Sequence, residues 1–289
     1  MKSMRLSLGV LCGPPLYRGV LSLLRDGVLP LRSGLAMARI GAAATLSARA
    51  VLLGRALFYL LVMTILGMFW NAVAAEHISD ALPLPSGIVL YVGIAELITL
   101  SVPAIHLRLE DDIRSGAIET HLLRPMPYLL AAISETIGGM AVRLGVLGLG
   151  GVVVLLALGL GHPPVAAWPL VIVLVLLGGT VHVMLVALTG LSTFWVRRSL
   201  AAYLIMQKLI FLLGGLFAPV TLYPVWLARI AACSPFAAAL YWPAVITLQH
   251  DTATVVTAFV AVFVWIAILA LLCGWIWRAG MRRLLARGV

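Results

Sequence analysis

Long apolar runs are the feature that most constrains this chain of 289 residues. A helix that crosses the hydrocarbon core of a bilayer needs about 20 predominantly apolar residues. The sequence holds six such runs, at about 51–75, 86–106, 138–160, 168–192, 200–222 and 253–276. Strands of a membrane barrel instead alternate polar and apolar residues over about ten positions. We therefore predict an all-α integral membrane fold, with six transmembrane helices in a membrane domain at residues 51–289.

The composition agrees with a membrane protein, because 63% of the residues are hydrophobic and only 10% are charged. A soluble domain carries about 25% charged residues. The formal net charge of +10 would suggest nucleic acid as the partner of a soluble protein, but here we attribute it to membrane topology. Cys12, Cys233 and Cys273 show neither CxxC pairing nor metal-ligand spacing, so the sequence indicates no disulfide framework and no metal site.

The basic residues predict how the chain is oriented. Nineteen of the 20 lysines and arginines fall on one side of the six predicted spans, or in the span ends nearest that side, and Arg229 alone lies in a loop on the other. Cytoplasmic loops of membrane proteins collect Lys and Arg. We therefore predict that both termini are cytoplasmic and that the acidic loop at 76–85 is external.

Residues 1–50 are not a predicted span, because arginine recurs too often among the apolar residues. This pattern is typical of interfacial amphipathic helices that lie against the inner leaflet. A disordered basic tail is the alternative, and Met37 would also make a reasonable N-terminus. We treat residues 1–50 as a cytoplasmic or interfacial segment.

One polar stretch interrupts the apolar chain at residues 108–130, "RLEDDIRSGAIETHLLRPMPYLL". It predicts a short helix at 109–124, with acidic residues in the first turn, where the helix dipole favours them. Leu109, Ile113 and Ala117 share one face at helical spacing, and two prolines end the element. The alternative is an ordinary solvated loop between the second and third spans.

The same stretch resembles the six-span permease subunits of ABC type 2 exporters, whose loop carries an Ile-Arg-Ser-Gly … Leu-Leu-Arg-Pro pattern. The matching residues here are Arg114, Ser115, Gly116, Leu122, Leu123, Arg124 and Pro125. A second stretch, at 214–246, is similar to the family's short helices between the fifth and sixth spans, with matches at Pro224, Trp226, Leu227, Pro235 and Phe236. The resemblance covers about residues 35–285.

The resemblance implies the permease of an ATP-driven exporter in the bacterial cytoplasmic (inner) membrane. It implies two cytoplasmic ATPase subunits, which hold ATP and Mg, and a second permease that is either a copy of this chain or a related one. The polar stretch would then be the coupling helix that docks on the ATPase, with the residues Leu109, Asp112, Ile113, Arg114, Ser115, Gly116, Glu119 and Arg124. No Gly-x4-Gly-Lys-[Ser/Thr] loop occurs in the sequence, so the chain has no usual phosphate cradle of its own. We expect it to bind no cofactor and not to be an enzyme by itself.

Polar residues inside the apolar runs are candidates for a substrate pathway, because an intramembrane charge is costly and usually faces protein or water. The candidates are Asn71, Glu96, Gln207 and Lys208, on the first, second and fifth spans, which line the pathway in the family fold. The alternative is that these residues only secure helix packing. His182 in the fourth span has no second ligand nearby in sequence, so it does not predict a metal site.

Two other classes of function compete with the exporter permease. An intramembrane enzyme would need a catalytic signature, and the sequence contains neither Gly-x-Ser-x-Gly nor His-Glu-x2-His. A transporter or scaffold that works without an ATPase is the other alternative, but the two halves show no obvious inverted repeat.

Overall fold

The structure is a computed structural model that describes residues 29–75, 85–118, 126–157, 159, 167–216, 220–247 and 251–286. Every secondary-structure element in these ranges is a helix, which confirms the all-α class. Among the described residues, five helical segments are long and apolar enough to cross a membrane, at Arg49–Phe69, Gly87–Ser115, Tyr128–Ala157, Trp168–Phe194 and Thr252–Leu284. Multi-pass membrane insertion is therefore the architecture that the fold supports.

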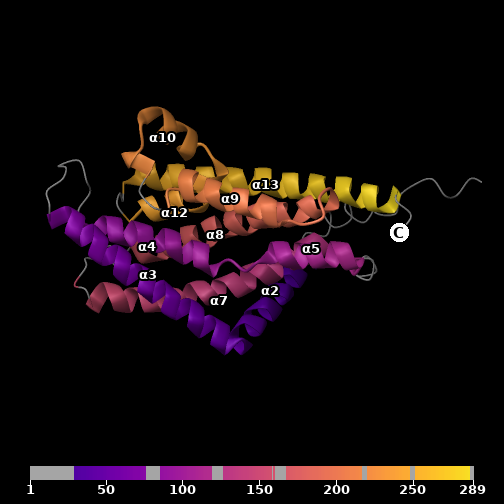
Figure 1. Cartoon of the computed structure of the whole chain (residues 1–289), viewed down its shortest axis with the longest axis horizontal. Coiled ribbons are helices and arrows are strands. Elements are labelled where there is room, and N and C mark those ends of the chain that lie inside the picture. Colours follow the sequence, from indigo (N-terminus) through magenta and orange to yellow (C-terminus); the bar gives the residue numbers. More distant parts are fainter. Residues whose placement is uncertain are drawn as a thin grey trace, which may run out of the picture.

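The first two helices form a V at one edge of the bundle (Figure 1). A single residue, Ala48, separates helix α2 (Leu29–Ser47) from α3 (Arg49–Ala75). Helix α2 packs closely on α7, since a Cβ added to Gly138 of α7 would lie 1.8 Å from the carbonyl oxygen of Ala38. Residues 29–47 of the predicted N-terminal segment are thus an ordered helix, while residues 1–28 lie outside the described residues.

The second predicted span is divided by a proline. Helix α4 (Pro85–Ser101) stops before Pro103, and the polar helix α5 (Ile105–Ser115) follows it. Proline lacks an N–H and its ring clashes with the preceding turn, which breaks a helix. Helix α4 therefore ends at Ser101, inside the span predicted at 86–106, and the spanning segment Gly87–Ser115 consists of two helices joined at Pro103.

Helix α7 (Tyr128–Ala157) begins ten residues before the predicted start at 138. The sequence prediction began the third span at 138, which left Glu135 in the preceding loop. In the structure, Glu135 forms an ion pair with Arg108 of α5 at 2.8 Å, so its charge is compensated on the helix.

Helix α8 (Trp168–Leu191) is more deeply buried than α7 or the C-terminal long helix. Its bounds agree with the predicted span at 168–192. Its small residues allow close packing: a Cβ on Gly178 would lie 2.6 Å from the carbonyl oxygen of Ala239. A 3-10 turn, η2 (Ser192–Phe194), continues it. Figure 1 shows α8 running between its neighbours along the length of the bundle.

The fifth predicted span, at 200–222, is shorter than expected. Helix α9 (Leu200–Leu213) ends at Gly214, and Gly215 follows with φ 69°. At 1.5 Å per residue, its 14 residues cover about 21 Å, against the about 30 Å of a bilayer core. The count of six spans therefore stays a prediction, because α9 is shorter than the bilayer core is thick.

The last part of the chain consists of short helices and one long one. Elements η3 (Val220–Leu222), α10 (Val225–Ala232), α11 (Pro235–Ala239) and α12 (Tyr241–Val245) come first. Helix α13 (Thr252–Ala286) then runs back along α8, ten residues beyond the predicted end at 276. Helix α5 and the C-terminal end of α13 lie at one end of the bundle, and α10 lies at the other end (Figure 1).

Candidate functional site

The polar helix α5 is attached to the bundle through its apolar face. The side chains of Ile105, Leu109 and Ile113 are buried. Leu109 packs on α8 at Gly190, where an added Cβ would lie 2.9 Å from the Leu109 side chain and 2.9 Å from the His106 backbone. The coupling prediction had the side chains of Leu109 and Ile113 contact a partner protein. That prediction is wrong, because the chain buries both side chains within its own bundle.

A buried carboxylate joins α5 to the start of α9. The Glu110 side chain accepts two hydrogen bonds from Ser199, one from the backbone N–H and one from the hydroxyl, each at 2.7 Å. Ser199 is the N-cap residue of α9, so a negative charge here also meets the positive end of the helix dipole. Arg114 adds a weaker contact at 3.4 Å. Two donors and a nearby guanidinium all favour the ionised form of Glu110.

An aromatic contact reinforces the link between α5 and α9. The ring of His106 stacks on the ring of Tyr203, with centroids 3.8 Å apart and planes inclined by 13°. Tyr203 lies one turn after Ser199, so the stacked pair and the Glu110 hydrogen bonds hold the same first turn of α9. Two independent contacts therefore fix the relative position of these helices.

Two polar contacts join α5 to the first turns of α7. Arg108 pairs with Glu135, and the Tyr128 hydroxyl donates a hydrogen bond to the Asp112 carboxylate. Tyr128 also stacks on Trp277 of α13, with ring centroids 5.3 Å apart. Helix α5 thus forms polar contacts with α7 and the start of α9, packs closely on α8, and reaches α13 through Tyr128.

The outer face of α5 has no such attachment to the bundle. Leu107, Asp111, Arg114 and Ser115 are exposed at helical spacing, and the Leu107 side chain is 50% exposed. The helix ends at Gly116, whose φ of 74° is a left-handed conformation that favours glycine at this position. Glu119 and Arg124, which the sequence prediction included in this element, lie outside the described residues.

The structure places the predicted pathway residues on three different helices. Glu96 is partly buried in α4, which packs on α3, α7, α8 and α12. Gln207 and Lys208 are exposed on α9, where Gln207 donates a hydrogen bond to the Tyr203 hydroxyl at 2.7 Å. Asn71 belongs to the last turns of α3, and nothing further is described of its side chain. The structure therefore ties Gln207 to the α5–α9 junction.

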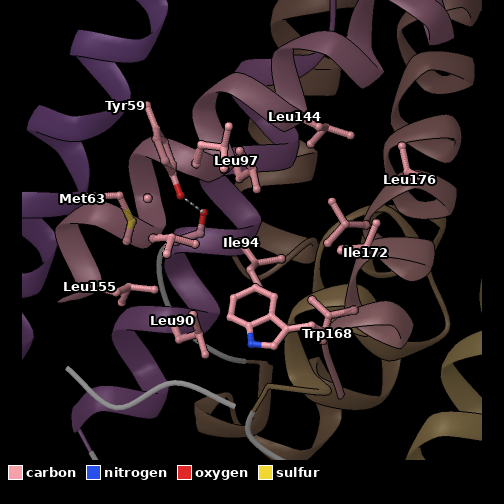
Figure 2. Close-up of a pocket in the computed structure, with 18 of the residues that line it drawn as sticks. Tyr59, Met63, Leu90, Ile94, Leu97, Leu144, Leu155, Trp168, Ile172 and Leu176 are labelled. Atoms are coloured by element: carbon pink, nitrogen blue, oxygen red, sulfur yellow. Dashed lines mark hydrogen bonds between the residues drawn. The ribbon is translucent and has the colours of Figure 1, made fainter. Parts of the chain in front are cut away.

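An apolar cavity of about 570 Å³ lies among α3, α4, α7 and α8. Figure 2 shows Tyr59, Leu97, Leu144, Ile172 and Trp168 around it. The hydroxyl of Tyr59 donates a hydrogen bond to the Gly93 carbonyl at 3.1 Å, drawn as a dashed line in the figure. The cavity walls are therefore mainly hydrocarbon, and the hydroxyl of Tyr59 already has a hydrogen-bond partner within the protein.

Sequence reasoning missed the groups that α5 contacts. Ser199, Tyr128 and Gly190 carry no signal of their own, because a serine before a helix and a glycine in a span are ordinary features. A usable signal was present at Glu135, because a carboxylate close to a long apolar run requires a partner. Among the residues that the structure describes, no group of three His, Cys, Asp or Glu side chains is placed to hold a metal ion.

The fold and this site define a multi-pass helical membrane protein with a polar helix bonded to several of its long apolar helices. A family model described as "ABC-2 family transporter protein" matches residues 86–288, which confirms the resemblance seen in the sequence motifs. The chain belongs to the ABC-2 transporter family. A comparison with curated proteins gives no match.

Proposed function

We propose that the chain is the membrane-spanning permease subunit of an ATP-driven exporter, and that α5 receives the motion of a separate cytoplasmic ATPase subunit. Membership of the ABC-2 family supports a transport role. The observation that carries the coupling proposal is the position of α5, a polar helix that is hydrogen-bonded or ion-paired to α7 and the start of α9 and packs closely on α8. A rigid displacement of α5 must therefore move or strain three membrane helices.

The assembly that follows has two permeases and two ATPase subunits. The ATPase subunits bind ATP and Mg, and the second permease is a copy of this chain or a related one. The complex lies in the bacterial cytoplasmic membrane, with both termini of this chain in the cytoplasm, as the basic residues predict. In this arrangement the exposed face of α5 meets the ATPase.

The route for the substrate passes along α3, α4 and α9 in this proposal. Lys208 supports it, because it is exposed on an apolar helix beside exposed Leu204 and Ile205. A lysine at the centre of a membrane helix costs about 2.5–3.5 kcal/mol on insertion scales. Contact with a second permease or with a water-filled path removes that cost. We assign Asn71, Glu96, Gln207 and Lys208 to this route.

Charge changes on the outer face of α5 test the coupling proposal. Leu107→Asp and Asp111→Arg alter exposed side chains, so the permease should fold and insert as before. The double variant should lose the co-purifying ATPase and ATP-driven transport, because an unpaired charge at a docking interface is strongly unfavourable. Ile113→Asp is unsuitable, since its side chain is 7% exposed and the change would damage the permease itself.

A matched charge reversal serves as the control. Asp251 is exposed and lies immediately before α13, away from α5, so Asp251→Arg should keep the ATPase. Full ATPase retention and full transport in the Leu107→Asp/Asp111→Arg variant would show that α5 is not the coupling element.

A further inference from the structure

The apolar cavity is open along one side. Of its lining residues, Ala141, Gly145, Leu149 and Val152 on α7 and Ile172 on α8 are exposed. Leu149 is 71% exposed and Ile172 is 54% exposed, so these side chains border the opening rather than seal it. Both helices are long enough to span the bilayer, and the opening therefore faces hydrocarbon.

Two arginines lie near the end of this cavity that is closer to α5. Arg55 is one turn before the lining residue Tyr59 on α3, and its Nη1 donates a hydrogen bond to the Leu100 carbonyl at 2.7 Å. Arg143 directly precedes the lining residue Leu144 on α7. The two guanidinium groups are near enough to repel each other.

This pair lacks an anionic partner within the described residues. Neither arginine belongs to an ion pair with an N···O distance of 4.0 Å or less. Arg143 Nη1 is buried and has no hydrogen-bond partner. Glu96 is close enough to Tyr59 to interact with its phenol, but it pairs with neither arginine. A buried guanidinium N–H without an acceptor costs free energy of folding. A negatively charged acceptor recovers more of this free energy than a neutral one, because hydrogen bonds between charged groups are stronger.

We propose that the cavity holds one acyl chain of an anionic phospholipid whose headgroup is bound by Arg55 and Arg143. The cavity lining runs along α7 from Ala141 to Leu155, about 21 Å at 1.5 Å per residue. One leaflet contributes about 15 Å to a bilayer core of about 30 Å. One lipid chain therefore fits the cavity lengthwise, with its headgroup at the arginines, in the leaflet on the α5 side.

The headgroup decides whether such a lipid stays bound. Moving an acyl chain from the bilayer into an apolar cavity brings no hydrophobic gain, because the surrounding lipid is equally apolar. Selective retention must then come from the anionic headgroup, which arginine recognises through paired hydrogen bonds. The cavity sets the shape of the ligand and the two arginines set its charge. This site lies apart from α5 and does not depend on the proposed coupling.

Lipid retention in the purified full chain, with any subunits that co-purify, tests the proposal. The protein is equilibrated in detergent with equal amounts of phosphatidylglycerol and phosphatidylcholine of matched acyl chains, and the bound lipids are counted by native mass spectrometry. We expect the wild type to prefer phosphatidylglycerol by about tenfold, as one charge-assisted hydrogen bond implies. Arg55→Gln/Arg143→Gln should abolish this preference.

A cavity-filling variant tests the acyl chain independently of the arginines. A Cβ on Gly145 meets nothing within 4 Å, so Gly145→Leu should fold normally. Because the leucine fills the cavity, this variant should bind neither phosphatidylglycerol nor phosphatidylcholine. Gly274→Leu is the matched control, since its Cβ on α13 also meets nothing within 4 Å. Arg278→Gln, an exposed arginine on the same helix, controls for loss of a positive charge.

Several results would overturn the assignment. Undiminished preference for phosphatidylglycerol in the arginine variants, or undiminished lipid binding in Gly145→Leu, would each refute it. Displacement of phosphatidylglycerol by millimolar inorganic phosphate would assign the arginines to a free anion. Loss of the permease pair in Gly145→Leu with unchanged lipid binding would make the opening a contact between subunits. If Arg143→Gln does not fold, Arg55→Gln together with Gly145→Leu still decides the question.

Discussion

Removing the Glu110 carboxylate should weaken the attachment of α5 to α9, leaving the His106–Tyr203 stack in place, and should measurably destabilise the permease. Glu110 accepts hydrogen bonds from the backbone N–H and the hydroxyl of Ser199, both at 2.7 Å and both to the same oxygen. A hydrogen bond to a charged group contributes about 1.5–3 kcal/mol. Two bonds that share one oxygen are not additive, and neighbouring Asp111 and Arg114 are exposed, so solvent lies nearby. We therefore expect Glu110→Ala to cost about 2–4 kcal/mol in all.

Ser199→Ala separates the two hydrogen bonds, because it removes the hydroxyl and keeps the backbone N–H. It should cost about 1–2 kcal/mol on its own. In a chain that already carries Glu110→Ala, the same change should cost almost nothing, since the acceptor is gone. Asp111→Ala, which alters the exposed neighbouring acid, should be within about 0.5 kcal/mol of the wild type.

Thermal unfolding of the purified chain in detergent, followed by tryptophan fluorescence, measures these differences. At about 2 °C per kcal/mol for a chain of this size, Glu110→Ala should lower Tm by about 4–8 °C. Ser199→Ala should lower it by about half as much. Equal Tm losses from Ser199→Ala with and without Glu110→Ala would refute the reasoning, because additive effects mean that the two residues do not interact.

Three further predictions test other parts of the fold. Gly138→Leu should separate α2 from α7 and lower Tm, because an added Cβ would lie 1.8 Å from the Ala38 carbonyl oxygen; an unchanged Tm would contradict this contact. In a chain without native cysteines, a membrane-impermeant thiol reagent should label a cysteine at Asp80 and not one at Ser115 from outside the cell; the reverse pattern would overturn the topology. Glu96→Gln should change transport while assembly and Tm stay near wild type, whereas a parallel loss of both would assign Glu96 to packing.

The helical membrane fold was predictable because long apolar runs admit few alternatives. The fourth span was placed within a residue or two of α8, where no charge or proline interrupts the run. The errors occurred where a proline, a glycine pair or a paired charge alters the helix ends, as at Pro103, Gly214–Gly215 and Glu135. The start of α7 was placed ten residues late, and the helix in fact includes Glu135, whose charge is compensated by an ion pair with Arg108 that the sequence does not reveal.

The sequence predicted a short polar helix, at 109–124, but neither its observed bounds nor the surface that its apolar face meets. Helical spacing put Leu109 and Ile113 on one face of a short polar helix, and the structure has that helix at Ile105–Ser115. Spacing alone does not say which surface an apolar face meets, and Gly190 on α8 accepts it. The cavity and its arginines could not be predicted either, because they depend on how the four helices α3, α4, α7 and α8 lie together.

Composition of the native complex is the most direct test of the central claim that this chain is the membrane half of an ATP-driven transporter. The full-length chain would be purified with a small tag from its own membranes in mild detergent, and the subunits identified and counted by mass spectrometry. We expect an ABC-type ATPase with a phosphate-binding loop in equal amount with the permeases, and ATP hydrolysis by the purified complex. A chain that purifies without any ATPase, and still transports in vesicles that lack ATP, would contradict the account.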